Sequence, residues 1–249
     1  MSAKSELTKP DIRLSCNVLK IIACVFMFID HFSYGVLHNY MIAHAMDLQP
    51  ETYKTLNTVY EVGRGVGRLA FPIFCFFLVE GFLRTHDVKK YAIRLLVLSV
   101  ITEVPFDLGL FGEIVHNDHQ NIIITFFIAL MMLVLLRFIS GNILGVSTWV
   151  VYLSYICTVI AFADVAYLLN SDYSWKCMLL VAVLYFTREA GVFRLLAGAC
   201  ATCWEKYAPI SFLLLYFYDP EKPPKFKYAF YLFYPIHLLV IYMIAKLVI

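Results

Sequence analysis

Charged residues are scarce in this sequence of 249 residues. Asp, Glu, Lys and Arg make up 15% of it and hydrophobic residues 61%, whereas soluble domains average about 25% and about 45–50%. A soluble fold of this length has too little interior to bury so much apolar surface, so the composition excludes an ordinary soluble domain. The net charge of +2 is too small to indicate nucleic acid binding.

The sequence also lacks an alternating apolar pattern, an internal repeat, a low-complexity tract and a linker that divides it into domains. Its apolar runs are long and continuous, which excludes a transmembrane β-barrel, a disordered chain and collagen. We therefore predict an all-α fold, a polytopic transmembrane helical bundle that forms a single domain over residues 1–249.

Six apolar runs are long enough to cross a bilayer. They lie at about 17–38, 58–83, 89–110, 119–139, 143–169 and 229–248. Three shorter runs, near 173–187, 190–203 and 207–218, indicate short or re-entrant spans. We predict about nine crossings. No small-residue cleavage site follows the first run, so we expect a retained first span after a polar tail at 1–16, not a signal peptide.

The distribution of positive charge predicts the orientation, because cytoplasmic loops retain Lys and Arg. With the N-terminus inside, the cytoplasmic segments carry eleven of the twenty Lys and Arg residues and the external segments carry four. We therefore predict a cytoplasmic N-terminus in a multi-pass protein of the cell membrane.

Several ionisable residues lie within the predicted spans, where an isolated charge costs about 2.5–3.5 kcal/mol and usually faces the bundle interior. Lys20 and His31 are eleven residues apart, close to three helical turns, so they share a face about 16 Å apart along the axis. Asp30 points about 100° away from His31. It is therefore not expected to orient His31 directly.

Depth along the spans sorts these residues into two layers. The deeper layer contains His31, Arg68 and His237 near the middle of the membrane or slightly outward, with Asp30, Glu103, Asn121 and Thr125 at comparable or shallower external depth. The layer at the inner edge is mostly basic and contains Lys20, Glu80, Arg84, Lys89, Lys90 and Arg94. This arrangement suits a polyanionic cytosolic donor whose long neutral arm carries a reactive group into the membrane, and acetyl-CoA has that shape.

In this hypothesis His31 is the general base for an acceptor amine or hydroxyl, and Arg68 or Asn121 stabilises the oxyanion. The same residues also have a structural interpretation. Intramembrane His and Arg side chains often serve only in hydrogen bonding, Arg194 suits helix packing, and Glu80 with Arg84 suits mutual neutralisation. We predict no metal site, because His116 and His119 lie in an expected solvated loop.

Several segments resemble the TraX family of membrane proteins. They are Leu19-Lys-Ile-Ile-Ala23 with Phe28-Ile-Asp-His31, Gly67-Arg-Leu-Ala-Phe-Pro-Ile-Phe74, Glu80-Gly-Phe82, Tyr91-Ala-Ile-Arg-Leu95, Asn121 with Thr125, and Phe230-Tyr-Leu-Phe-Tyr-Pro-Ile-His-Leu238. The likeness covers nearly the whole chain in order, although 140–228 carries little of it. The spacing of Lys20 and His31 is also similar to the Arg/Lys-x10-His signature of membrane acyltransferases.

The resemblance implies an acetyl-CoA-dependent membrane acetyltransferase, because the founding TraX protein is associated with conjugation and implicated in N-terminal acetylation of pilin. The matching positions are Lys20, Asp30, His31, Arg68, Glu80, Arg94, Asn121 and His237. The acceptor stays open between a pilin-like peptide and a surface glycan. Two alternatives also remain: a transporter with a buried relay of ionisable residues, and a non-catalytic assembly factor for a pilus or conjugation complex.

Overall fold

The computed structural model describes residues 13–143, 145–221 and 227–249. Within those residues the named elements are all helices, and the extended pairing consists of two isolated bridges. The predicted all-α class is therefore confirmed. Most of the predicted polar tail at 1–16 lies outside the described residues.

Eleven α-helices follow one another along the described chain, with one π-turn and one 3-10 turn among them. In order they are α1 (Cys16–Phe32), η1 (Ser33–His38), α2 (Asn39–Ala43), α3 (Pro50–Gly67), α4 (Ala70–Arg84), α5 (Val88–Phe111), α6 (Ile122–Gly141), α7 (Thr148–Leu168), α8 (Ser174–Phe186), α9 (Val192–Ala201), η2 (Ala208–Ile210), α10 (Ser211–Tyr216) and α11 (Lys227–Val248). The π-turn η1 begins directly after α1.

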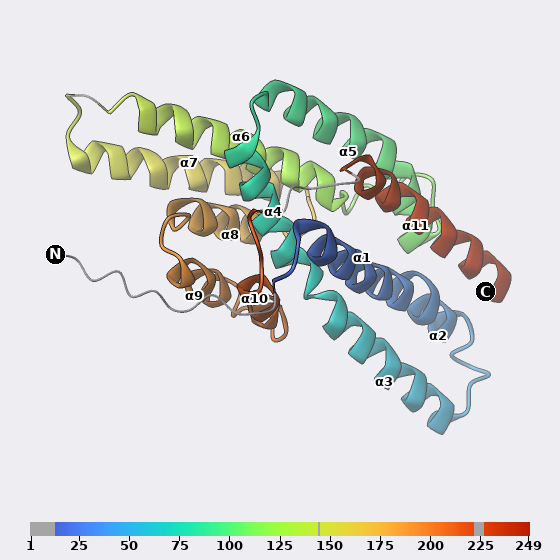
Figure 1. The fold of residues 1–249 in the computed structure, drawn as a ribbon. Helices are drawn as coiled ribbons and strands as arrows, with labels where there is room; N and C mark the ends of the chain where they lie inside the picture. The colour runs from blue at the N-terminus through green and yellow to red at the C-terminus, as the bar shows by residue number, and fades with distance from the viewer. Residues whose placement is uncertain (1–12, 144, 222–226) are drawn as a thin grey trace.

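Helix α4 is the centre of the molecule. It packs against α1, α6, α8 and α10, and Figure 1 shows it between the α6–α7 hairpin on one side and the α1–α3 hairpin on the other. Its first ten residues, 70–79, are apolar on every face, which is the pattern of a helix buried all round. Most of its side chains are buried, including those of Phe71, Ile73, Phe77 and Phe82.

Helices α5 and α11 pack along each other and close the remaining side of the molecule. Asp87 caps α5, because its side chain accepts a 2.9 Å hydrogen bond from the Lys90 amide. That N–H holds the pKa of Asp87 below its ordinary value. At the other end α5 stops at Gly112, whose φ of 74° is left-handed and suits glycine.

Five helical stretches are both long and apolar enough to cross a membrane: 16–43, 50–84, 122–141, 148–168 and 228–248. Helix α5 has 24 residues but carries five charged residues, while α8 and α9 have 13 and 10. These three are therefore not in that set, and about nine crossings and a cytoplasmic N-terminus remain predictions.

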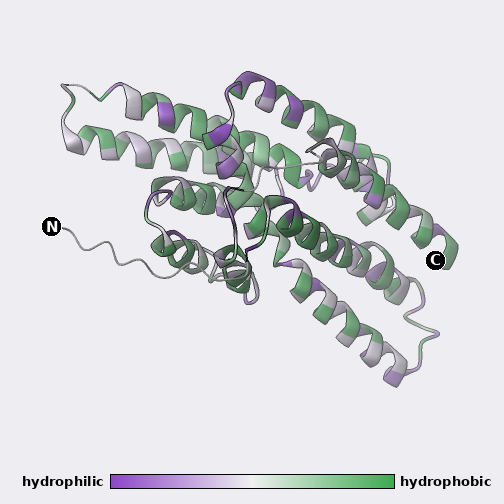
Figure 2. Cartoon of the chain, viewed as in Figure 1, coloured by the Kyte–Doolittle hydropathy of each residue, from purple (hydrophilic) through white to green (hydrophobic). Residues whose placement is uncertain are grey.

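The apolar run at 58–83 is not one uninterrupted helix. Helix α3 begins eight residues earlier, at Pro50, and the chain turns at Arg68 and Leu69 before α4 starts. Figure 2 shows why the apolar pattern missed this beginning, since the far end of α3 is mostly pale or hydrophilic. The break matters because it lies beside the residues that form the candidate site.

Candidate functional site

A cavity of about 350 Å³ lies between α1, α4, α5, α6 and α11. One end, the histidine end, is lined by His31, Asp30, Asp172, Tyr173 and Tyr234. The other, the basic end, is lined by Lys20, Arg84, Arg94 and Glu80. Apolar side chains line the wall between them, among them Phe74, Phe77, Leu98 and Phe126. Thus two residues of the predicted deeper layer, His31 and Asp30, line one end of the cavity, and three of the predicted inner layer, Lys20, Arg84 and Arg94, line the other.

Two histidines from different helices meet at the histidine end. Nδ1 of His31 on α1 lies 2.8 Å from Nε2 of His237 on α11, and both side chains are buried. Nδ1 of His237 lies 3.0 Å from the carbonyl oxygen of Phe233, one helical turn earlier. The ring of Tyr234 stands edge-on to both, with its centroid 6.1 Å from that of His31 and 5.4 Å from that of His237.

The carbonyl of Phe233 fixes the tautomer of this pair, because a carbonyl oxygen only accepts hydrogen bonds. A neutral His237 therefore carries its proton on Nδ1 and accepts at Nε2. His31 must then donate from Nδ1, which leaves its Nε2 unprotonated. In the described part of the chain Nε2 of His31 has no hydrogen-bond partner, so its lone pair is available to a ligand in the cavity.

Asp30 is paired with an arginine and does not contact His31. Its Oδ2 lies 2.8 Å from Nη1 of Arg64 on α3, while its Oδ1 is buried without a hydrogen-bond partner among the described residues. A Cβ on Gly67 would collide with the Asp30 side chain. Glycine at 67 therefore lets α1 and α3 approach closely, and Asp30 keeps one free acceptor in the wall of the cavity.

Asp172 and Tyr173 reach the cavity from the loop between α7 and α8. The loop is fixed to the start of α6, because the Asp172 amide donates to the Gln120 carbonyl (3.1 Å) and the Thr125 hydroxyl donates to the Asp172 carbonyl (2.8 Å). Tyr173 has a φ of 57°, an unusual conformation for a bulky residue that only the surrounding contacts maintain. The ring of Tyr173 stacks on that of Phe71, with centroids 3.8 Å apart.

Arg68 and Asn121 do not line this cavity. Arg68 donates from Nη1 to the Tyr173 hydroxyl (3.1 Å), and its Nε lies 3.6 Å from a carboxylate oxygen of Glu205. Its guanidinium therefore stands behind the wall that Tyr173 forms. Because neither Arg68 nor Asn121 lines the cavity, their positions do not support the oxyanion role predicted for one or the other.

Asn121 has a structural task at the start of α6. Its side-chain oxygen accepts from the Ile123 amide at 2.9 Å, which caps the helix. Its amide nitrogen donates to the Ser99 carbonyl at 2.9 Å and also to the Glu103 carboxylate. These contacts join α6 to α5 and occupy the amide group.

The basic end is lined by three of the five residues predicted to bind the donor, namely Lys20, Arg84 and Arg94. Nζ of Lys20 lies 5.3 Å from the Phe77 ring centroid and 5.7 Å from that of Phe230, and no carboxylate of a described residue is within ion-pair distance. Nε of Arg94 is buried and has no hydrogen-bond partner among the described residues. Lys20 and Arg94 thus face the cavity with unused positive charge.

Lys89 and Lys90 do not line the cavity, although both are on α5 close to its basic end. Both are exposed, and Nζ of Lys90 lies 3.3 Å from the Asp87 carboxylate. Their predicted contact with the donor would therefore have to be made outside the cavity.

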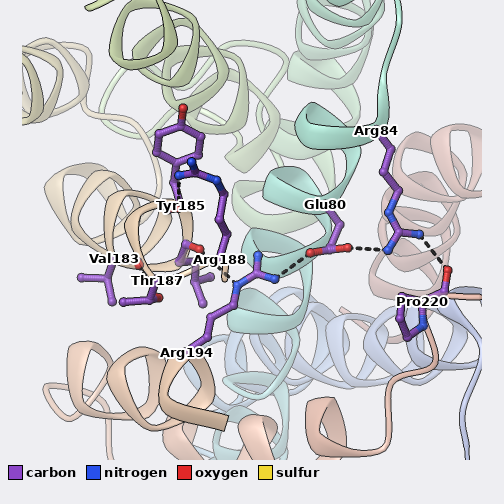
Figure 3. A network of polar contacts seen from close by, with 9 residues as sticks. Glu80, Arg84, Val183, Tyr185, Thr187, Arg188, Arg194 and Pro220 are labelled. Atoms are coloured by element: carbon purple, nitrogen blue, oxygen red, sulfur yellow. Dashed lines mark hydrogen bonds and ion pairs between the residues drawn. The ribbon is translucent and has the colours of Figure 1, made fainter. Parts of the chain in front are cut away.

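Glu80 links two arginines at the basic end. Its two carboxylate oxygens lie 2.7 Å from Nη2 of Arg84 and 2.6 Å from Nη1 of Arg194 on α9, as Figure 3 shows. Arg194 is 7% exposed, and its Nε donates to the Leu184 carbonyl at 3.1 Å. The expected packing role of Arg194 thus includes a buried ion pair, while Arg84 also donates to the Pro220 carbonyl (3.1 Å).

Among the described residues there is no group of three or more His, Cys, Asp or Glu side chains placed to hold a metal ion. The polar groups that line the cavity are instead one imidazole, carboxylates, phenols and cations. These are groups that bind and move protons and anions.

The fold and the cavity together define an all-helical membrane protein with a histidine pair and a basic cluster at opposite ends of one internal site. The chain belongs to the TraX family, since the TraX protein family model matches residues 15–245. It is also 28% identical to the probable fimbrial assembly protein FimC, serogroup H1, of Dichelobacter nodosus, over 92% of this chain and 94% of that protein. No solved structure matches the chain.

Sequence reasoning missed Asp172 and did not assign a role to Tyr234. The sequence could have indicated Tyr234, because it lies in the Phe230–Leu238 segment three residues before His237. Asp172 gave no signal, since it lies in the stretch 140–228, where the family resemblance is weak and the loop is placed only by tertiary contacts.

Proposed function

We propose that this protein is a multi-pass acetyltransferase of the cell membrane, which transfers an acetyl group from cytosolic acetyl-CoA to an amine or hydroxyl acceptor. The observation that carries the proposal is the single cavity that joins the basic end to a histidine with a fixed tautomer. A transferase of this kind needs an anion site and a base about one pantetheine arm apart. Eleven residues of α1 separate Lys20 from His31, about 16 Å along the helix.

His31 has the properties of the general base. Its Nε2 accepts the proton of the attacking amine or hydroxyl, and the imidazolium then returns that proton to the leaving thiolate. The positive charge formed on His31 is stabilised by the Nδ1–H bond to His237, because His237 is held as an acceptor by the Phe233 carbonyl. His237 therefore acts through His31 and is a positioning residue.

Tyr234 is better placed than Arg68 or Asn121 to stabilise the negative charge on the carbonyl oxygen. Its hydroxyl is buried, lines the cavity and has no hydrogen-bond partner among the described residues. A preformed donor at the position where charge develops contributes the most to such reactions, about 2.7–4 kcal/mol for one hydrogen bond. We assign this role to the Tyr234 O–H.

The unused polar atoms of the cavity fit acetyl-CoA as a substrate. Acetyl-CoA supplies a thioester carbonyl and anionic phosphates. Lys20, Arg84 and Arg94 supply positive charge at one end, and the buried Nε of Arg94 has no hydrogen-bond partner among the described residues. Because buried polar groups are usually paired, such atoms indicate contact with a ligand.

The experiment that tests the proposal is a binding titration of the purified protein with acetyl-CoA, followed by transfer of radiolabelled acetyl groups to membrane fractions. Saturable binding and label transfer that is lost in His31→Ala, with binding retained, support the proposal. Absence of binding by the folded protein would overturn it.

A role in pilus assembly is the second candidate, because the name of the relative FimC refers to fimbrial assembly. The two proposals are compatible if the acceptor is a pilus subunit. They differ when His31 is removed, because an assembly factor without catalysis still supports pilus formation with His31→Ala. The transporter alternative predicts substrate flux in proteoliposomes without any acyl donor.

A further inference from the structure

An aromatic wall closes the histidine end of the cavity. It consists of Phe71 on α4 and Tyr173 from the loop between α7 and α8, and both residues line the cavity. Their rings stack with centroids 3.8 Å apart and an interplanar angle of 5°. The wall lies far from the basic end, because nine residues of α4 separate Phe71 from Glu80, about 14 Å along the helix.

Three side chains behind the wall hold its two rings in place. The Tyr173 hydroxyl accepts a hydrogen bond from Nη1 of Arg68 at 3.1 Å. The ring of Trp204 stands edge-on to both rings, with its centroid 6.3 Å from that of Phe71 and 6.0 Å from that of Tyr173. Nζ of Lys176 lies 4.3 Å from the centroid of the Trp204 ring. Arg68, Trp204 and Lys176 are not among the residues that line the cavity, so they support the wall from outside.

The backbone of the wall is fixed as well. The Tyr173 amide donates to the Asp172 carboxylate at 3.0 Å. The Tyr173 carbonyl accepts from the amides of Lys176 at 2.9 Å and Cys177 at 3.3 Å. Because packed interiors are not readily compressed, a ring that is held both from behind and at its backbone yields little to a ligand.

The acyl group of a bound donor would meet this wall. In the proposed function the phosphates stay at the basic end, and the thioester lies beside His31 and Tyr234. The acyl group is the end of the donor opposite to the phosphates. It therefore extends past His31, to where Phe71 and Tyr173 close the cavity. A methyl group can pack against the wall, whereas each further methylene has to displace a ring.

We infer that Phe71 and Tyr173 limit the length of the acyl group, so that the cavity accepts acetyl and excludes longer acyl chains. The inference rests on the proposed function, because it needs an acyl-CoA donor in this cavity. It names the residues that select the donor, which the role of His31 as a base does not do.

The test compares the affinities of the purified full chain for acetyl-CoA and butyryl-CoA, which differ by two methylenes. One methylene in a hydrophobic pocket changes discrimination by about 10–200-fold, so the unmodified protein should bind acetyl-CoA at least about tenfold more tightly. Tyr173→Gly removes the ring, and glycine adopts the φ of 57° without strain. We expect this variant to lower the ratio of the two affinities at least about tenfold.

Two controls separate the length of the cavity from its general packing. Tyr173→Phe keeps the ring and its contacts with Phe71 and Trp204, so the ratio should be unchanged. Phe74→Leu enlarges the apolar wall between the two ends, beside the pantetheine arm, and should change both affinities by the same factor. Thermal unfolding shows whether each variant is folded, and Phe71→Leu opens the same aromatic wall if Tyr173→Gly fails to fold.

The outcomes keep the inference and the proposed function apart. A ratio that falls in Tyr173→Gly but not in Tyr173→Phe or Phe74→Leu supports the inference. Acetyl-CoA binding with the same ratio in the unmodified protein and in Tyr173→Gly would overturn the inference and leave the proposed function standing. Equal affinities of the unmodified protein for both donors would overturn it too, and would leave an acyl-CoA donor in place. Absence of binding of either donor by the folded protein would overturn the proposed function itself.

Discussion

Nδ1 of His31 lies 2.8 Å from Nε2 of His237, and this contact joins the first and last helices of the described chain at the histidine end of the cavity. The two residues are 206 positions apart in sequence. Because the Phe233 carbonyl fixes the proton on His237, the two imidazoles have different tasks. His31 faces the ligand, and His237 sets the tautomer of His31.

Substitutions of His31 and of His237 should therefore lower the rate of acetyl transfer by different amounts. His31→Ala removes the base and should lower the rate of transfer by about 10²–10⁴-fold. His237→Ala leaves the base but not its orientation, and we expect a loss of about 10–100-fold, by analogy with the loss when the hydrogen-bond partner of a metal-binding histidine is removed. His237→Gln, whose side chain offers an acceptor to His31, should recover part of the rate.

Steady-state kinetics at saturating acetyl-CoA measure this difference, and the pH profile gives a second readout. If His237 only fills space, His237→Leu and His237→Gln should behave alike, with no change in the profile. Equal losses for His31→Ala and His237→Ala would contradict the assignment of His31 as the group that contacts substrate.

The sequence was enough to select residues at both ends of the cavity, but not the residues that pair with them. The spacing of Lys20 and His31 on one helix predicts a shared face and a separation along it, since both depend only on helix geometry. The partners come from other helices: Arg64 for Asp30, His237 for His31 and Arg194 for Glu80. A single sequence does not show which helices are neighbours.

The same limit explains the residues whose predicted and observed surroundings differ. Depth along a span predicts only the layer in which Arg68 and Asn121 lie, and depth does not determine which way a side chain faces. Arg68 turns to Tyr173 and Glu205, and Asn121 caps α6. Asp172 depends on a loop whose conformation is set by contacts with α6, so no local pattern marks it.

The Asp30–Arg64 ion pair should be energetically coupled, because both side chains are mostly buried at 14% and 22% exposure. Asp30→Asn and Arg64→Leu should each destabilise the protein, since each leaves a charge without its partner. The double variant should lose less than the sum, with a coupling energy of about 0.5–3 kcal/mol. Thermal unfolding of the four proteins in detergent measures this coupling, and strictly additive effects would show that the pair contributes nothing.

Gly67 should not tolerate even one added methyl group. A Cβ there would overlap the side chain of Asp30, so Gly67→Ala should separate α3 from α1 and lower stability by about 1–3 kcal/mol, the range for overpacking. Gly141 on α6 has open space around it. Gly141→Ala is therefore the matched control, expected to be neutral or stabilising by up to about 1 kcal/mol. Similar melting temperatures for both variants would mean that the close approach is not needed.

The basic residues at and near the basic end of the cavity should differ in whether they contribute to acetyl-CoA binding. Arg94→Ala and Lys20→Ala remove groups that line the cavity, and each should weaken acetyl-CoA binding by about 10–100-fold, because a hydrogen bond to a charged group contributes about 1.5–3 kcal/mol. Lys90→Ala is the matched control on α5, because Lys90 pairs with Asp87 outside the cavity.

A titration with acetyl-CoA gives the three affinities, and desulfo or dephospho analogues identify which part of the molecule each residue contacts. If Arg94 and Lys20 hold phosphates, removal of the 3′-phosphate should cost the unmodified protein more than it costs the corresponding variant. Loss of binding in Lys90→Ala, with Arg94→Ala unaffected, would place the donor on the exposed surface of α5 and outside the cavity.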